Sequence, residues 1–389
     1  MKKLIYAFFI FLFCSTAFAG GSKADFLKTG FRGFVCTTMD SSGNLLYHDT
    51  GNTVSYLGES DFRLMAAKGA NLLRVFVDTI YPVATPTTFA NVATAQKTTL
   101  ENLLTWGYKY GFNVVVVLEP MDSNGVVEVP APYWGANTAT AAPNLAAVWS
   151  DLVTTIHAYP AIEGYDLLNE PMQTTTSQTD LEAMFNPLVA AIRGVDATTP
   201  IIVESTERGY PHDLYNFTST FMNSDSNLVY SFHYYSPWPY ASQGINNPTY
   251  TPTSYPNGTT TTYTTQLADL NTAILFGNGS RNHISAAVPV YVGEYGAVRW
   301  APGSLQYISD LKSIWEAQGW SWTFFSWRPS YDGWNYELGD TSYTPNAHTG
   351  VPQPSSSSMM QIQNSLSGSA LWPASPCGYK YTAASKACN

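Results

Sequence analysis

The feature of this 389-residue sequence that most restricts its fold is an alternation of short apolar runs with amphipathic stretches. The apolar runs are rich in β-branched residues, and residues 114–118 read Val-Val-Val-Val-Leu. Continuous runs of this kind are typical of strands that are covered on both faces, as in a parallel sheet. The predicted strands are Phe31–Thr37, Asn71–Val77, Asn113–Leu118, Ile162–Leu168, Pro200–Glu204, Leu228–Tyr234, Val288–Glu294 and Ser321–Trp327.

Between these runs, apolar residues recur at helical spacing. The cleanest pattern is Leu145, Val148, Trp149, Leu152 and Ile156, ended by Pro160. Eight strands in strict alternation with about eight helices favour an α/β fold, a single-domain (β/α)₈ TIM barrel over residues 20–369. The alternative is a doubly wound open sheet, but no Gly-x-Gly-x-x-Gly sequence follows any predicted strand. Other helices are predicted at 60–68, 100–111, 181–192, 213–222, 261–276, 305–315 and 356–366.

The first nineteen residues have the pattern of a secretory signal peptide. A basic pair, Lys2-Lys3, precedes an apolar run at 4–13 and a small-x-small cleavage site at 17–19. The apolar run is shorter than the roughly 20 residues that a membrane-spanning helix needs. We therefore expect a secreted or periplasmic protein with no membrane attachment after the peptide is removed.

Composition argues against some partners and favours others. Loss of Lys2 and Lys3 with the signal peptide changes the formal net charge from −10 to −12, so nucleic acid is not an expected partner. Only 12% of residues are charged, against roughly 25% in average globular proteins, while 14% are aromatic. A surface poor in charge and rich in Tyr and Trp suits neutral, hydroxyl-covered ligands. A large core beneath a Thr/Ser/Asn surface explains the same figures equally well.

Cysteine and histidine give little support for a metal or another cofactor. Cys36 lies in a predicted strand, where we expect a buried thiol. Cys377 and Cys388 lie in a short C-terminal tail, residues 370–389, and export predicts a disulfide between them. The six histidines form no His-x-x-x-His pair and no Cys/His cluster. The sequence therefore predicts no metal site and no cofactor.

Carboxylates are found where the chemistry of such a barrel takes place, at the C-terminal ends of the strands. Four predicted strands finish in or next to one: Glu119, Glu170, Glu204 and Glu294. A carboxylate at the mouth of a barrel, with few basic residues nearby in sequence, is costly unless it is paired or used. One such residue is more often a structural acceptor, but four favour a paired-carboxylate reaction such as glycosidic bond hydrolysis. Residue type alone does not decide which two form the pair.

The sequence around two of these glutamates resembles glycoside hydrolase family 5, the endoglucanase and mannanase family. Residues 166–171 read Asp-Leu-Leu-Asn-Glu-Pro at the end of the fourth predicted strand, and residues 290–296 read Val-Tyr-Val-Gly-Glu-Tyr-Gly around the end of the seventh. Supporting matches are the segments 72–75, 231–235, 322–327 and 332–339. The resemblance covers roughly residues 30–345, and the order of the two motifs makes it specific.

The resemblance implies a retaining double displacement on a (β/α)₈ barrel. Glu170 would be the general acid/base, and Glu294 would be the nucleophile that forms a glycosyl-enzyme. Once Glu294 is esterified its charge disappears, so Glu170 can act as a base toward water. In retaining enzymes the two carboxyl groups lie about 5–5.5 Å apart, which a structure can test.

The resemblance also implies supporting roles for the neighbours of this pair. Asn169 is similar to the residue that hydrogen-bonds the sugar 2-OH. Arg74 would keep the nucleophile ionised and oriented through a charge-assisted hydrogen bond. Tyr235 would donate to Glu294, and His233 would bind sugar or orient the acid/base pair.

The chain departs from the family pattern at two strand ends. Residues 118–122 read Leu-Glu-Pro-Met-Asp where many family members have a histidine pair after an acid. Residues 324–327 read Phe-Phe-Ser-Trp, so the sugar-stacking aromatic residue corresponds to Phe325 or Trp327, and we expect Trp327. Glu119 and Glu204 are expected to be structural residues or to bind substrate at a subsite.

The expected protein is a monomeric, endo-acting glycosidase on β-1,4-linked polysaccharide, with glucan as the expected polymer. Residues 236–260, rich in Pro, Tyr and Thr, are expected to line its cleft with Trp238 and Tyr240. A β-mannanase or β-1,3-glucanase on the same scaffold remains an alternative, because mannose differs from glucose only at C2. A non-catalytic carbohydrate-binding barrel would have lost a carboxylate, and both are present. A metal-dependent hydrolase would need ligands that the histidine spacing does not supply.

Overall fold

The chain forms a closed barrel of eight parallel strands in the order β1-β10-β9-β8-β7-β6-β5-β4. They are β1 (Arg32–Cys36), β4 (Leu72–Tyr81), β5 (Asn113–Asp122), β6 (Ile162–Asp166), β7 (Ile201–Glu204), β8 (Leu228–Tyr234), β9 (Val290–Tyr295) and β10 (Ser321–Phe324). The predicted (β/α)₈ barrel is confirmed and the open sheet is wrong, because β1 pairs with both β4 and β10. This computed structural model describes residues 25–26, 30–36, 42, 46–48, 54–127, 131–171, 178–245, 251–257, 263–270, 289–327, 332–336, 381–382 and 387–388.

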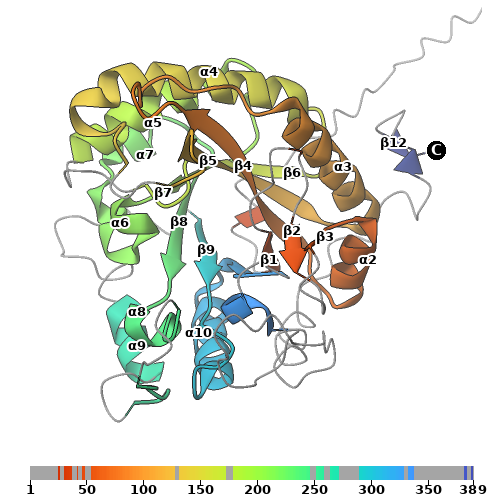
Figure 1. The fold of residues 1–389 in the computed structure, drawn as a ribbon, viewed down its shortest axis with the longest axis vertical. Helices are drawn as coiled ribbons and strands as arrows, with labels where there is room; N and C mark the ends of the chain where they lie inside the picture. Colours follow the sequence, from red (N-terminus) through yellow and green to blue (C-terminus); the bar gives the residue numbers. More distant parts are fainter. Residues whose placement is uncertain are drawn as a thin grey trace, which may run out of the picture.

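Helices lie between successive barrel strands and surround the ring (Figure 1). The apolar stripe predicted on α4 is buried, including Leu145, Trp149 and Leu152. Within the described residues, none of the helices has the length and apolar character needed to span a bilayer. The helices are α2 (Glu59–Ala67), α3 (Thr94–Tyr110), α4 (Thr138–Ile156), α5 (Gln178–Arg193), α6 (Thr206–Gly209), α7 (Ser219–Met222), α8 (Trp238–Ala241), α9 (Tyr263–Leu270) and α10 (Ser304–Gln318), with 3₁₀ turns η1 (Gly135–Asn137), η2 (Pro211–Asn216) and η4 (Asp332–Trp334).

Some predicted elements differ from the structure. The helix predicted at 213–222 is split into η2 and α7, because the Thr218 side chain accepts a hydrogen bond from the Phe221 N–H and begins a new helix. Two antiparallel pairs were not predicted: β2 (Leu46–His48) with β3 (Val54–Tyr56), and β11 (Tyr381–Thr382) with β12 (Ala387–Cys388). Cys36 is a buried free thiol, as expected. The signal peptide 1–19, residues 271–276, the helix at 356–366 and Cys377, with its expected disulfide, lie outside the described residues.

Strands β4 and β5 continue four residues beyond their predicted ends. Their ladder runs on from Asp78 opposite Glu119 to Tyr81 opposite Asp122. Polar residues interrupt the apolar run there, although both Asp78 and Glu119 are buried. The long pair carries the sheet past the rim of the barrel and forms one wall of its mouth.

The N-terminal end of the barrel is closed by an apolar layer. Side chains alternate along each strand, so every second residue points inward. The strand-borne side chains of this layer occupy early positions in their strands, and all are almost completely buried. The apolar layer consists of Phe26, Phe31, Leu72, Val115, Ile202, Val229 and Tyr291.

Candidate active site

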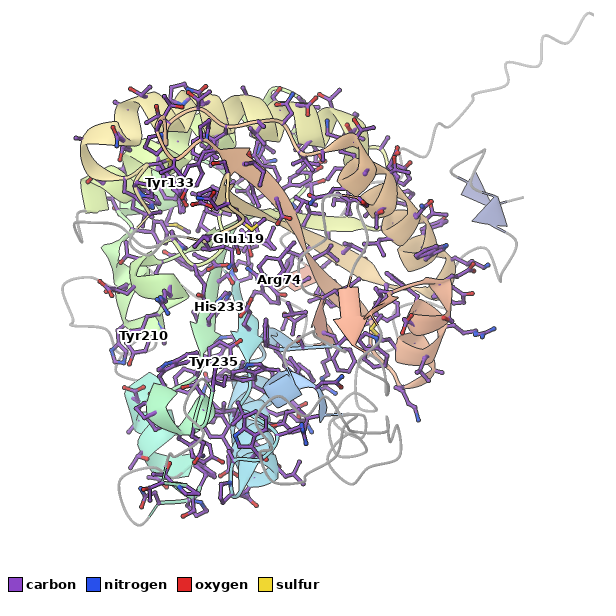
Figure 2. All side chains as sticks on the ribbon, viewed as in Figure 1. Arg74, Glu119, Tyr133, Tyr210, His233 and Tyr235 are labelled. Carbon is purple, nitrogen blue, oxygen red and sulfur yellow. The ribbon has the colours of Figure 1, made fainter. Side chains whose placement is uncertain are left out.

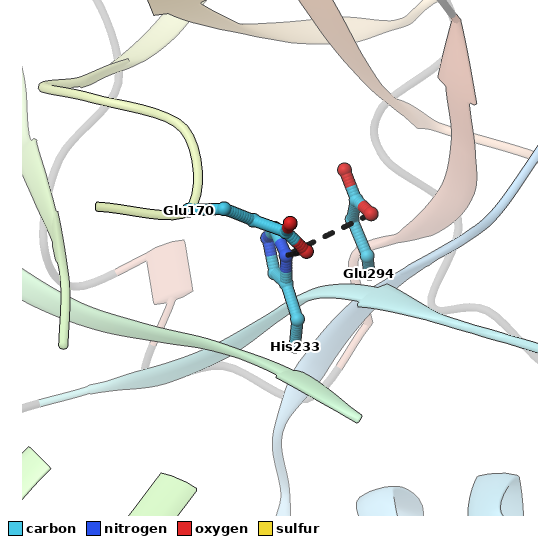
Figure 3. A group of neighbouring side chains, drawn as sticks. All are labelled: Glu170, His233 and Glu294. Carbon is cyan, nitrogen blue, oxygen red and sulfur yellow. Dashed lines mark hydrogen bonds and ion pairs between the residues drawn. The ribbon is translucent and has the colours of Figure 1, made fainter. Parts of the chain in front are cut away.

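Glu170 and Glu294 meet at the C-terminal mouth of the barrel. Glu170 follows β6, and Glu294 lies near the end of β9. One carboxylate oxygen of each, together with a ring nitrogen of His233, lie within 4.8 Å of one another. Figure 3 shows the two carboxyl groups on adjacent sides of the His233 ring. The structure therefore brings the two sequence-predicted acids together.

The backbone of Glu170 adopts an unusual conformation. Its φ of 42° lies in the left-handed region, which non-glycine residues seldom occupy and which often marks functional sites. The Glu170 N–H donates a hydrogen bond of 2.9 Å to Oε2 of the buried Glu204. Its side chain is 30% exposed, in contrast to the side chains around it. Glu204 thus holds the turn that presents Glu170 to solvent.

Glu294 receives donors on both carboxylate oxygens. Arg74 Nη1 donates to Oε1 at 2.7 Å, and the Tyr235 hydroxyl donates to Oε2 at 2.8 Å. These are the contacts that the sequence predicted for both residues. Gly293 makes room for this arrangement, because a Cβ there would lie 2.7 Å from Ser231 Oγ and 3.1 Å from His233 Nε2.

Arg74 joins several acidic residues into one network. Figure 2 labels Arg74 in the barrel. Its side chain is completely buried, and besides Glu294 it donates to Asp166 Oδ2 at 3.0 Å and to Glu204 Oε1 at 2.6 Å. A fourth bond runs from Nη2 to Asn169 Oδ1 at 3.0 Å. Burial alone would lower the pKa of Arg74, but the surrounding carboxylates raise it well above its usual value. Arg74 is therefore a permanent cation beside Glu294.

His233 contacts three acids at once. Its Nδ1 lies 2.8 Å from Glu170 Oε1 and 3.7 Å from Glu294 Oε2, and its Nε2 lies 3.3 Å from Glu204 Oε1. Burial alone would lower the pKa of His233, but the three acids raise it well above 6.5. The ring is therefore protonated at neutral pH. Glu170, His233 and Glu294 have a spacing that fits a metal ion, and binding one would require loss of the imidazole proton.

The pKa values of the carboxyl groups around Arg74 and His233 shift in different directions. Burial would raise the pKa of Glu204, but His233 and Arg74 lower it to about 2. Burial and the neighbouring Glu204 raise the pKa of Asp166 well above its usual value, against the opposing effect of Arg74 and His233. Burial also raises the pKa of Glu294, against the opposing effect of both cations. We call Arg74, Asp166, Glu204, His233 and Glu294 the charged layer.

Trp327 does not reach the site. It is 1% exposed, and its indole N–H donates to Asp61 Oδ1 at 3.3 Å in the layer outside the barrel. The expectation that Trp327 stacks on a sugar is therefore wrong. Strand β10 ends at Phe324, so the inward alternation does not continue to residue 327. Phe325 is partly exposed instead, with its ring 6.3 Å from that of Tyr235.

The segment after β8 contributes one of its two expected aromatic residues. Trp238 is 54% exposed, and its ring packs edge-on against Tyr235 at 5.8 Å. Tyr240 is buried against Tyr255 and Tyr307, so the expectation that it lines the cleft is wrong. Pro237 lies at the N-cap of α8, and the single turn of this helix places the two rings in different environments.

Sequence reasoning missed the parts of the network that lie below Glu170 and Glu294. The motif at 166–171 begins with Asp166, for which the sequence indicated no role, yet Asp166 bonds directly to Arg74. Its inward position on β6 was a usable signal, because β6 alternation also points Gly164 inward. Glu119 accepts a 2.7 Å hydrogen bond from the Asn169 amide, a contact that no spacing in the sequence indicates.

Comparison with known proteins identifies the family. The sequence profile of "Cellulase (glycosyl hydrolase family 5)" matches residues 31–330. No curated protein matches the sequence.

Several solved structures share the fold. Endoglucanase Cel5A from Thermotoga maritima has a TM-score of 0.62 at 16% identity, over 89% of this chain and 99% of that one. The same enzyme in complex with mannotriose has a TM-score of 0.61 at 14% identity, again over 89% and 99%. Cellulose synthase subunit Z from Clostridioides difficile has a TM-score of 0.57 at 16% identity, over 87% and 99%. The profile covers most of the chain, so the chain belongs to glycosyl hydrolase family 5, and the protein is a cellulase-like glycoside hydrolase.

Proposed function

We propose that the protein is a retaining endo-β-1,4-glucanase in which Glu294 is the nucleophile and Glu170 the general acid/base. The observation that carries the proposal is the separation of the two carboxyl groups: one carboxylate oxygen of Glu170 lies within 4.8 Å of one of Glu294. This is close to the roughly 5–5.5 Å of retaining glycosidases, whereas inverting enzymes need about 6.5–9.5 Å to admit water.

The contacts of the two glutamates support this division of roles. Glu294 is buried beside Arg74, a cation that only donates, so its ionised form is the one that the 2.7 Å hydrogen bond stabilises. Glu170 is the more exposed of the two and bonds to His233. Its carboxyl group can therefore give a proton to a leaving group and later take one from water.

The reaction then proceeds in two balanced steps. An oxygen of Glu294 attacks the anomeric carbon while the bond to the leaving oxygen breaks, and Glu170 gives its proton to that oxygen. In the second step water attacks the anomeric carbon, Glu170 takes the water proton, and the ester bond to Glu294 breaks. His233 stabilises Glu170 whenever it is ionised, since the protonated ring lies 2.8 Å from its Oε1. Asn169 hydrogen-bonds the sugar 2-OH.

Exposed aromatic rings support a polysaccharide substrate. The exposed Trp238 and the partly exposed Phe325 both have their rings beside Tyr235, and such rings offer apolar faces to sugars. The Thermotoga maritima enzyme is named in complexes with cellobiose and with mannotriose. A β-mannanase is therefore the second candidate, because a barrel of this fold holds both kinds of oligosaccharide.

Release of reducing sugar from a panel of polysaccharides tests the substrate. We expect the highest rate on carboxymethylcellulose, less on glucomannan, and little on galactomannan, xyloglucan or laminarin. The Glu294→Gln protein, prepared in parallel, serves as the blank for contaminating activity. A preference for galactomannan would replace the glucanase by the mannanase, and no Glu294-dependent release from any of them would reject the proposal.

The stereochemistry of the first product tests the mechanism. We expect NMR of early time points on cello-oligosaccharides to show the β-anomer, because two displacements restore the original configuration. Initial formation of the α-anomer would reject the double displacement while leaving the hydrolase activity intact.

Export and oligomeric state complete the proposal. The signal-like pattern at 1–19 supports secretion or delivery to the periplasm, and mass spectrometry of the exported protein should place its N-terminus at Gly20. We further propose that the enzyme acts as a monomer, which sedimentation at working concentration checks.

A further inference from the structure

Glu119 occupies a position at the site that the reaction described above does not use. It lies on the inward face of β5, two residues beyond Val117, whose side chain is in the barrel interior. Glu119 and Arg74, both labelled in Figure 2, bond to the same residue, Asn169. Asp78 is the neighbour of Glu119 across the β4–β5 ladder. Glu119 is 5% exposed, so its carboxyl group has little access to bulk water.

Glu119 controls the orientation of Asn169. The Asn169 side-chain oxygen accepts from Arg74 Nη2 at 3.0 Å, and its Nδ2 donates to Glu119 Oε2 at 2.7 Å. Arginine has no acceptor, so the amide oxygen must face Arg74 and the amide nitrogen must face Glu119. One amide hydrogen remains, and Glu119 sets the direction in which it points.

The surroundings of Glu119 are acidic. Its charged neighbours are Asp78 on β4, Glu170 after β6 and Glu294 on β9, while the buried Tyr133 approaches from the loop after β5. No cationic side chain of the described residues bonds to it. Burial, followed by the charges of Glu170 and Asp78, raises the pKa of Glu119 well above its usual value.

The neighbouring Asp78 is a second buried carboxyl group on this side of the mouth, and its burial favours the protonated form. Gln96 holds it from both ends, accepting from the Asp78 N–H at 2.9 Å and donating to Oδ2 at 2.8 Å. Its Oδ1 is buried and has no hydrogen-bond partner among the described residues. An ionised carboxylate with a bare buried oxygen would be costly, whereas a carboxylic acid carries its own hydrogen there.

We propose that Glu119 is a sugar-binding and positioning residue that works as a neutral carboxylic acid. Its carbonyl oxygen fixes the Asn169 amide, and its O–H donates to a hydroxyl of the sugar ring held between Glu170 and Glu294. A protonated acid combines one acceptor with one donor, which an ionised carboxylate does not. The inference rests on the proposed glycosidase function and adds to it a second contact to the ring beside Asn169.

Two variants of similar length separate this role from its alternatives. Glu119→Gln keeps an acceptor and a donor without ever ionising, so it imitates the protonated acid. Glu119→Met keeps the bulk and removes both hydrogen bonds, which releases Asn169 and leaves the sugar hydroxyl without a donor. At pH 6, we expect kcat/KM on cello-oligosaccharides to fall about threefold in Glu119→Gln and about a hundredfold in Glu119→Met, since small displacements of positioned groups cost that much.

The pH profile adds a readout that a merely structural residue would not change. Ionisation of Glu119 replaces the donor by an acceptor and puts a negative charge beside Glu170 and Glu294. Relative to wild type, Glu119→Gln should therefore keep its kcat/KM to higher pH, while the acid side of the profile coincides. Asp78 titrates in both proteins, so its contribution cancels in the comparison.

The outcomes are distinguishable from failure of the proposed function. Equal losses in Glu119→Gln and Glu119→Met, in a wild type that shows Glu294-dependent hydrolysis, would overturn the neutral-acid role alone. Near wild-type kinetics in both variants would do the same. Lack of Glu294-dependent hydrolysis in the wild type would overturn the proposed function and this inference with it. Urea unfolding of each variant shows whether a loss of activity reflects misfolding. If Glu119→Met does not fold, the pH profile of Glu119→Gln, which is expected to fold and to be active, decides the question.

Discussion

The barrel interior contains two layers that are equally buried and chemically opposite. Strand β4 places Leu72 and then Arg74 on its inner face, and β7 places Ile202 and then Glu204. All four side chains are inaccessible to solvent. Leu72 and Ile202 belong to the apolar layer, whereas Arg74 and Glu204 bond to each other in the charged layer. Two residues further along the same strand, an apolar side chain that needs no hydrogen-bond partner is followed by a charged side chain that needs several.

The difference teaches which layer supports which property. Burial of apolar side chains stabilises the fold by about 25 cal/mol per Å² and depends on no particular neighbour. Burial of an ion costs several kcal/mol, which only well-placed partners offset. We therefore expect the apolar layer to control stability alone, and the charged layer to couple stability to activity.

The largest effect is expected from Glu294 in the charged layer and from Glu170, which lies next to it on the solvent side. Glu294→Gln should lower kcat at least about 10⁴-fold and Glu170→Gln about 10²–10⁴-fold, because an amide neither attacks the anomeric carbon nor transfers the proton. Steady-state kinetics on carboxymethylcellulose measure both losses. Both proteins should remain folded, since glutamine keeps the shape of glutamate.

A matched control is available on the outside of the barrel. Glu101 on α3 accepts a hydrogen bond from the Tyr159 hydroxyl, far in sequence from the charged layer. Glu101→Gln should retain wild-type kcat. Turnover near the wild-type level in Glu170→Gln or Glu294→Gln would contradict their assigned roles.

The next effect in size is expected at Arg74, where both properties should fall together. Arg74→Met leaves Glu204 and Asp166 buried without their cation, which should cost about 3–5 kcal/mol of unfolding free energy. Activity should fall as well, because Glu294 loses a donor. Urea unfolding and kinetics on the same preparation test the coupling. The exposed Arg63→Met on α2 should change stability by no more than about 0.5 kcal/mol; equal effects of the two substitutions would remove the distinction between the layers.

The apolar layer should respond in stability only. Ile202→Ala deletes buried methyl and methylene groups and leaves a cavity, so we expect the free energy of unfolding to fall by about 2–5 kcal/mol. The kcat of the folded fraction at 25 °C should equal that of the wild type. A large fall in kcat without unfolding would show that the apolar layer also positions the catalytic groups.

The same contrast explains how much of the fold was predictable from sequence. A strand covered on both faces is typically a continuous apolar run, so the eight barrel strands could be located from the apolar runs along the sequence. The ends of β4 and β5 could not, because Asp78 and Glu119 interrupt the run. Their burial depends on Gln96 and Asn169, which are brought to them only by the fold.

Prediction of the site had a similar limit. Glu170 and Glu294 lie in local motifs at strand ends, where a few adjacent residues identify them. The network beneath them joins Arg74 to residues 92 and 130 positions away, a distance over which spacing carries no information. The wrong choice was Trp327 over Phe325, because the motif Phe-Phe-Ser-Trp offers two aromatic residues and only the end of β10 at Phe324 separates them.

The smallest effect is expected at Asp78, beside the charged layer, as a change in how the free energy of unfolding depends on pH. Burial raises the pKa of Asp78 to about 6, above its ordinary value of 3.8. The folded protein therefore binds this proton more tightly than the unfolded chain does. Its stabilising contribution is complete below about pH 4 and is lost as the pH rises through about 6, by roughly 3 kcal/mol in total.

Asp78→Asn removes that titration and keeps an oxygen for the Gln96 amide. The difference in unfolding free energy between Asp78→Asn and wild type should therefore shift in favour of the variant by up to about 3 kcal/mol from pH 4 to pH 7. Urea unfolding at intervals across this range measures the shift, and every other titrating group is common to both proteins. A difference that stays constant with pH would mean that Asp78 is ionised in the folded enzyme. The mouth of the barrel would then hold one more negative charge beside Glu119 throughout this pH range.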